Sequence, residues 1–128
     1  MELQKAKPTP TPKARGAVVT KAAVRAADHL NLANVELGKI LGLSPATVSR
    51  MRNGQFVLDA DGKAFELAAL FVRLYRSLDA VVGGDDLVAA TWIRRDNLAL
   101  QKKPIDLIQK VVGITHVLQY LDTRRAII

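Results

Sequence analysis

Few side chains in this sequence could act as nucleophiles, acid–base catalysts or metal ligands. Cysteine is absent, which excludes disulfides, thiolate nucleophiles and cysteine-bound zinc. The two histidines, His29 and His116, lie in different halves of the chain, and neither belongs to an HExxH pattern. Asp85 and Asp86 are adjacent carboxylates, but acidic pairs at the start of a helix usually serve the helix dipole. We therefore expect no enzymatic activity, no metal site and no cofactor.

Positive charge, by contrast, is abundant and unevenly distributed. The 128 residues carry 19 Lys/Arg and 12 Asp/Glu, a net charge of +7. Residues 1–54 contain 9 Lys/Arg and 3 Asp/Glu, hence +6, whereas residues 55–128 contain 10 and 9, hence +1. A polyanion such as DNA is the natural partner of so basic a half. A solvated basic face that serves solubility is the alternative on charge alone.

The segment LGLSPATVSRMRNG, residues 41–54, has the spacing of a helix-turn-helix. Gly38, Gly42 and Val48 stand at intervals of four and six residues. Two helices that cross steeply at a short turn need three things: a small residue where their backbones approach, a residue that tolerates positive φ, and an apolar wedge on the second helix. All three occur at the required places. The sequence therefore predicts a helix-turn-helix whose second helix is opened by a Ser-Pro pair.

Helical geometry decides which side chains of that second helix face outward. At about 100° per residue, turning Val48 and Met51 inward leaves Arg50 on the opposite side. Eight helical residues span about 12 Å, which the major groove of DNA admits. Arg50 is then the best candidate for a bidentate contact with guanine, and Arg52, on the flank, for a phosphate contact. An inert packing role for the motif is the alternative. The predicted DNA-contacting residues are Ser44, Ala46, Thr47, Ser49, Arg50, Arg52 and Asn53, with Ser44 serving first as the helix N-cap.

Helical periodicity extends through most of the chain, so we expect an all-α fold. The longest predicted helix, residues 63–82, places apolar residues at alternating offsets of four and three. Asn31 is expected to cap the second helix, and Asp85 or Asp86 the fifth. Gly113 is expected to break the helix before the last one. Besides the second helix of the motif, the predicted helices cover residues 14–30, 31–41, 63–82, 85–95, 104–112 and 114–128.

Composition and the predicted elements divide the chain into four regions. Residues 1–13, rich in Pro, Thr and Lys, are interpreted as a flexible basic tail. Residues 14–58 form the helix-turn-helix region, residues 59–84 a connecting and dimerisation helix, and residues 85–128 a C-terminal helical domain. No apolar run is long enough to span a bilayer, and no signal-peptide core is present at the N-terminus. We therefore expect a soluble cytoplasmic protein without membrane contact.

A homodimer is expected on physical grounds. One short reading helix supplies little affinity, and helix-turn-helix proteins commonly read two half-sites as twofold dimers. The long helix at residues 63–82 has a second apolar stripe that could serve the dimer, formed by Phe65, Leu70, Val72 and Tyr75. The alternative is a central helix that is buried on all sides within one chain.

Residues 91–125 carry a more specific order of residue types: a Trp, an Asn five residues later, a Pro, an apolar helix, a Gly and a Val-x-x-Tyr-Leu element. This order resembles the toxin-binding domain of Xre/MbcA/ParS antitoxins, in which an Xre-like helix-turn-helix precedes a helical C-terminal domain. The resemblance covers about residues 18–128. Two features depart from the family pattern: the segment LALQKK lacks the usual glycine, and the chain ends RRAII without an Arg-Gly. The matching residues are Trp92, Asn97, Leu100, Pro104, Leu107, Ile108, Gly113, Val117, Tyr120 and Leu121.

The resemblance implies an antitoxin. Its C-terminal domain would bind a RES-domain toxin, an enzyme that consumes NAD, and would exclude NAD by covering or entering the active-site cleft. Its helix-turn-helix would bind operator DNA in the promoter of its own operon. Each implied toxin contact also has a structural alternative, such as core packing for a Trp, a turn cap for an Asn, or the helix dipole for C-terminal Arg. A plain dimeric repressor without a toxin partner is the alternative function. The implied toxin-binding residues are Trp92, Asn97, His116, Tyr120, Arg124 and Arg125.

Overall fold

The structure is a computed structural model that describes the backbone of residues 8–127 and the side chains of residues 8–126. Residues 1–7 of the predicted basic tail, and Ile128, lie outside the described residues. Seven helices are present within the described range, and no strand, so the all-α prediction is confirmed. The helices are α1 (Pro12–His29), α2 (Asn34–Leu41), α3 (Pro45–Arg52), α4 (Lys63–Val81), α5 (Asp86–Arg94), α6 (Pro104–Leu107) and α7 (Val111–Ile127).

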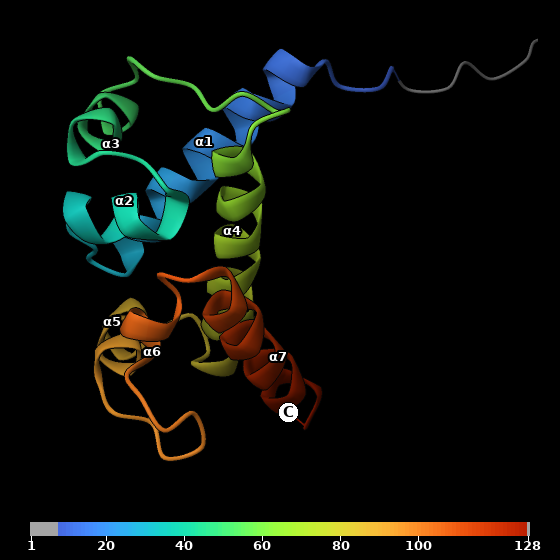
Figure 1. The fold of residues 1–128 in the computed structure, drawn as a ribbon. Coiled ribbons are helices and arrows are strands. Elements are labelled where there is room, and N and C mark those ends of the chain that lie inside the picture. The colour runs from blue at the N-terminus through green and yellow to red at the C-terminus, as the bar shows by residue number, and fades with distance from the viewer. Residues whose placement is uncertain (1–7, 128) are drawn as a thin grey trace, which may run out of the picture.

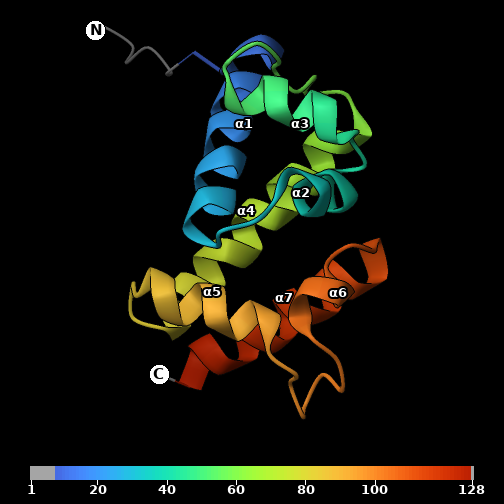
Figure 2. The ribbon, with the colours of Figure 1, turned by 90° about the vertical axis from the view of Figure 1, so that its left-hand side faces the viewer.

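The long helix α4 is the axis of the molecule. Near one end α1 and α2 pack against it, and α3 packs on α1 and α2; near the other end α5 and α7 pack against it, and α6 packs on α5 and α7 (Figures 1 and 2). Phe71, Leu74 and Leu78 of α4 are fully buried and belong to one continuous core, which extends into both groups of helices. The second apolar stripe of α4 is half-buried and packs against this core. Among the helices of residues 8–127, none combines the length and the hydropathy that a bilayer span requires.

Three side-chain caps fix the starts of the helices. The Oγ1 of Thr11 accepts a hydrogen bond of 3.1 Å from the amide of Ala14 at the start of α1. At the start of α3 the Oγ of Ser44 accepts one of 3.1 Å from the amide of Thr47. Asp85, rather than Asp86, caps α5 by accepting from the amide of Val88. The predicted caps at residues 44 and 85 are thereby confirmed, because short polar side chains satisfy amides that the first turn of a helix leaves free.

The predicted cap at Asn31 is wrong. Asn31 has φ of 56°, in the left-handed region, and ends the path of α1 instead of starting α2. Asparagine is among the few residues that adopt this conformation readily, so the same residue type suits a helix end as well as a helix start. Ala33 is the N-cap residue of α2, and its amide donates 2.8 Å to the carboxylate of Glu36.

The predicted helix break at Gly113 is also wrong. The break lies between Leu107 and Val111, and Gly113 sits inside α7, fully surrounded. A Cβ added to Gly113 would lie 1.8 Å from the carbonyl oxygen of Leu107. The glycine is therefore required by the close approach of α6 to α7. It does not interrupt the helix, because its backbone conformation is helical.

Candidate functional site

The helix-turn-helix has the geometry that its residue spacing predicts. A Cβ on Gly38 would lie 2.4 Å from the carbonyl oxygen of Leu43, so α2 and the turn approach too closely for any larger residue. Gly42 has φ of 72°, which few other residues adopt at low cost. Val48 of α3 is completely buried against α2 and the core. These contacts fix the crossing of α2 and α3 and hold one face of α3 at the surface (Figure 1).

The outward face of α3 carries most of the predicted DNA-contacting residues. Arg50 is exposed, and its Nη2 donates a hydrogen bond of 3.1 Å to the Oγ1 of Thr47, one turn earlier. The hydroxyl of Ser44 donates 2.9 Å to the same oxygen, so the guanidinium lies along the helix surface. Exposed Ala46 and Asn53 and half-buried Ser49 complete this surface. The structure thus brings together six of the seven predicted residues, and their contacts with DNA stay a prediction.

Arg52 is the exception, because its guanidinium is used inside the protein. Its Nη1 donates a hydrogen bond of 2.6 Å to the Oδ1 of Asn34, and its Nη2 donates one of 2.8 Å to the carbonyl oxygen of Leu32. Asp28 lies 3.6 Å from the same Nη2, and the Nε is buried without a partner in the described part of the chain. Arg52 therefore braces the end of α3 against the start of α2. A phosphate contact by Arg52 stays a prediction, although the guanidinium that would make it already binds within the chain.

Two further cations lie beside α3 that sequence reasoning did not select. Lys21 and Arg25 of α1 are exposed and line a hollow between α1 and the segment that follows α3, which includes Gly54 and Phe56. Their spacing of four residues places them on one face of a helix, and that spacing could have identified them. Together with Arg50 they add to the positive charge at this end of the molecule.

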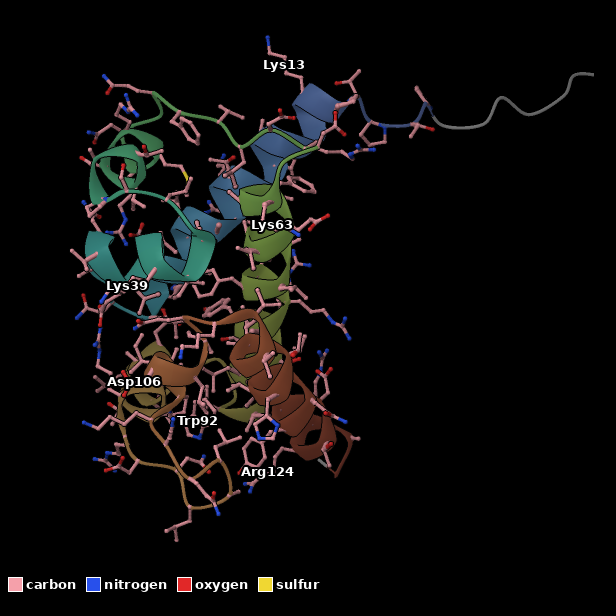
Figure 3. All side chains as sticks on the ribbon, viewed as in Figure 1. Lys13, Lys39, Lys63, Trp92, Asp106 and Arg124 are labelled. Atoms are coloured by element: carbon pink, nitrogen blue, oxygen red, sulfur yellow. The ribbon has the colours of Figure 1, made fainter. Side chains whose placement is uncertain are left out.

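A second candidate site lies where α5 faces α7. The rings of Trp92 and Tyr120 are stacked, with centroids 6.4 Å apart and planes 14° from parallel. The guanidinium of Arg124 lies 5.9 Å from the centre of the Tyr120 ring, on the same side of α7. Figure 3 shows Trp92 and Arg124 at the end of the molecule remote from α3. We call Trp92, Tyr120 and Arg124 the aromatic–arginine stack; it unites three of the six predicted toxin-binding residues.

An apolar hollow adjoins the aromatic–arginine stack on α5. It is lined by Leu87, Val88, Thr91 and Trp92, together with the polar residues Arg95, Asp96 and Asn97. Leu87 is 77% exposed and Val88 47% exposed, although both are large aliphatic residues. Exposed aliphatic side chains around a hollow are typical of a surface that another molecule covers. The sequence analysis does not select either residue. Their positions could have identified them, because both lie on the side of α5 away from buried Ala89 and Ile93.

The other three predicted toxin-binding residues have different surroundings. Asn97 holds a turn: its Oδ1 accepts 3.0 Å from the amide of Leu100, and its backbone bridges to Lys102. His116 is exposed and lies one turn before Tyr120, on the side of α7 that carries the aromatic–arginine stack. Arg125 is exposed but lines a separate groove between α4 and α7. The structure therefore groups His116 with the stack and separates Arg125 from it.

Ionic contacts join α5 to the helix-turn-helix. The guanidinium of Arg94 donates to both carboxylate oxygens of Glu36, at 2.8 and 2.9 Å. These hydrogen bonds lower the pKa of Glu36 below its ordinary value of 4.5 and raise that of Arg94. At the other end of α5 the hydroxyl of Tyr75 donates 3.2 Å to Asp86. Burial, followed by the charges of Asp79 and Asp86, raises the pKa of Tyr75 to about 12.

The lowered pKa of Glu36 predicts a pH dependence of stability. A carboxylate whose pKa is lower in the folded state stabilises the fold above its unfolded pKa, and the contribution disappears as the pH falls through the folded pKa. The free energy of unfolding of the wild type should therefore exceed that of Glu36→Gln at pH 7, and the difference should shrink below about pH 4.5. Urea titrations at pH 7, 5, 4 and 3 measure it. A difference that is constant over this range would contradict the prediction.

No group of three or more His, Asp or Glu side chains that could hold a metal ion occurs in the part of the chain that the structure describes. The architecture is that of a helix-turn-helix protein with an appended helical domain that presents a partly apolar face. The sequence matches the antitoxin Xre-like helix-turn-helix domain over residues 10–73 and the antitoxin Xre/MbcA/ParS C-terminal toxin-binding domain over residues 77–126. The chain belongs to the Xre/MbcA/ParS family of antitoxins, and the boundary between its two matched domains falls within α4.

One solved structure supports the same assignment. The chain is similar to a chain in the crystal structure of the M. tuberculosis MbcT-MbcA toxin-antitoxin complex, with 26% sequence identity and a TM-score of 0.63. The similarity covers 87% of this chain and 96% of that chain, so it includes both domains. No curated protein matches the sequence.

Proposed function

We propose that this protein neutralises a RES-domain, NAD-consuming toxin through its C-terminal domain and represses its own operon through α3. The observation that carries the first part is the aromatic–arginine stack beside an exposed apolar hollow, on the domain that matches a toxin-binding family. The toxin and antitoxin of the similar M. tuberculosis structure form a complex, which supports a protein partner of this kind here. Both activities would take place in the cytoplasm.

Occlusion of the toxin's active site is the mechanism that these side chains favour. The exposed aliphatic groups of Leu87 and Val88 and the ring of Trp92 provide an apolar anchor that would be desolvated on binding. Arg124 lies next to this anchor and offers a planar guanidinium that can bind a carboxylate, or replace the counter-charges of a cofactor phosphate, through two hydrogen bonds. A toxin that accepts this surface in its cleft would have no room for NAD.

Repression would use the opposite end of the molecule. The exposed Arg50 and its neighbours on α3 would enter the major groove, while Lys21 and Arg25 lie where a phosphate backbone could pass. A homodimer would place two reading helices one turn of DNA apart and so raise the affinity of one short helix. The second apolar stripe of α4 is only half-buried within one chain, which leaves part of it available to a second copy.

Co-expression with a cognate RES-domain enzyme tests the proposal. Growth inhibition by the enzyme should be relieved by the full chain, and a plain repressor would leave the inhibition unchanged. Deletion of residues 123–128 removes Arg124 together with exposed Thr123, Arg125 and Ala126, and should abolish the relief. If the truncated chain is folded and still relieves inhibition completely, the part that we give to this segment is wrong.

Replacement of Arg50 by Ala should weaken operator binding by about tenfold or more, because one bidentate base contact contributes about 1–3 kcal/mol. Affinity for the toxin should be unchanged, since α3 lies at the other end of the molecule. Fluorescence anisotropy with DNA from upstream of the gene measures the first quantity, and calorimetry with the toxin measures the second. Lys110→Ala, an equal charge change at an exposed position outside α3, is the control. Equal losses in both assays would show that Arg50 supports the fold.

A further inference from the structure

Two arginines from different domains bind neighbouring carbonyls of one short loop. The loop between α1 and α2, residues 30–33, is called the connecting loop below. Within this loop, the carbonyl oxygen of Asn31 accepts a hydrogen bond of 3.0 Å from the Nη2 of Arg94, which belongs to α5. The next carbonyl oxygen, that of Leu32, accepts a hydrogen bond of 2.8 Å from the Nη2 of Arg52, the last residue of α3. The connecting loop is therefore held on one side by the toxin-binding domain and on the other by the reading helix.

Each arginine makes a second contact that extends this hold into α2. Arg94 binds both carboxylate oxygens of Glu36, and Glu36 also accepts 2.8 Å from the amide of Ala33 at the end of the loop. Arg52 binds the Oδ1 of Asn34, the first residue of α2, at 2.6 Å. The fork of a guanidinium fixes direction as well as distance. Both guanidinium groups therefore restrain the connecting loop and the first turn of α2.

The other end of α5 is tied to the same region. The Nδ1 of His29, the last residue of α1, lies 2.6 Å from Asp86, and the imidazole stacks on the Tyr75 ring with centroids 5.4 Å apart. Asp86 and Arg94 are the first and last residues of α5, so both ends of the helix are anchored on the helix-turn-helix side. Between these anchors α5 carries the exposed hollow with Leu87 and Val88.

We propose that the connecting loop couples the two proposed binding activities, with Arg94 and Arg52 as its positioning residues. The inference rests on the proposed function, because it concerns the toxin and the operator. A toxin seated on α5 immobilises that helix, and Arg94, the connecting loop and Arg52 pass the constraint to α3. Operator DNA then has less disorder to remove when it binds α3, so its affinity rises. By linkage the operator raises toxin affinity by the same factor.

The test measures operator affinity of the full chain, both free and saturated with a catalytically inactive form of a cognate RES-domain enzyme. For the wild type we expect the toxin to tighten operator binding by about tenfold, within the usual range of coupling between two sites. In Arg94→Gln the factor should fall below about twofold. The Arg94 guanidinium is bound to Glu36 and Asn31 and does not line the hollow, so toxin affinity measured without DNA should change little. Lys110→Gln, with the same charge change at an exposed site, should keep the full factor.

Three outcomes overturn the inference: operator affinity of the wild type that does not rise with toxin, full coupling in Arg94→Gln, or loss of coupling in Lys110→Gln. Failure of the proposed function is distinguishable, because the wild type would then bind no toxin in the titration without DNA. Glu36→Gln breaks the same contact from the other side and should reproduce the effect of Arg94→Gln. Amide hydrogen exchange of the free Arg94→Gln chain should be faster in residues 31–34 and 45–53 than in the wild type; unchanged exchange in α3 would also overturn the inference.

Discussion

Replacement of Trp92 by Ala should weaken toxin binding by at least about 30-fold, or about 2 kcal/mol, the loss typical of a central aromatic anchor. The indole lines the apolar hollow and stacks on Tyr120, so its removal takes away apolar contact area and a support of the Tyr120 ring. Operator affinity of the free chain should stay within about twofold, because the arginine contacts of α3 do not involve Trp92. Calorimetry with the inactive toxin measures the first effect.

Two variants separate this binding loss from damage to the fold. Trp92 is half-buried, so its truncation also costs stability, and thermal unfolding must show that Trp92→Ala is folded at the assay temperature. Trp92→Phe keeps a ring over Tyr120 and should recover most of the affinity. Tyr120→Phe removes only the hydroxyl, which lies 3.4 Å from Arg124, and should have a small effect. If a folded Trp92→Ala chain binds toxin as tightly as the wild type, the toxin-binding face lies elsewhere.

Sequence patterns predicted well those features that depend on neighbouring residues. The spacing of Gly38, Gly42 and Val48 gave the helix-turn-helix, because a close approach, a left-handed turn and an apolar wedge each limit the residue type at a single position. The cap at Ser44 and the extent of the α4 helix were predicted for the same reason. Such features can be derived from a window of a few residues.

Contacts between distant segments were not predictable in this way. Arg52 was selected as a phosphate contact because its place on the flank of α3 was known, but its acceptors lie 18 and 20 residues earlier in the chain. Arg94 was not selected at all, since Glu36 is 58 residues away. The sequence does not show which Lys or Arg side chains form hydrogen bonds within the folded chain. Positions and periodicity identify a face of a helix, and tertiary contacts decide whether that face is free.

Residue types with two uses account for the two wrong local predictions. Asn31 was expected to start a helix and in fact ends one, because asparagine favours both N-caps and left-handed conformations. Gly113 was expected to break a helix, whereas it lies inside α7 to make room for the Leu107 carbonyl. In both cases the residue type indicated a special position correctly, and only the packing of the next element distinguished between the two uses.

The close contact at Gly113 leads to the largest expected effect on stability. Gly113→Ala should lower the free energy of unfolding by about 3 kcal/mol, at the upper end for an overpacked site, and the melting temperature by roughly 10 °C. Helix propensity alone favours Ala over Gly by about 1 kcal/mol, so the loss of stability depends wholly on the contact with the Leu107 carbonyl.

The control is Gly83→Ala, at φ of 67° with no neighbour within 4 Å, which should cost only about 1–2 kcal/mol of backbone strain. Thermal and urea unfolding measure both variants. A Gly113→Ala chain as stable as the wild type would mean that α6 and the start of α7 lie farther apart in solution, and that the proposed toxin-binding face is less rigid than its contacts imply.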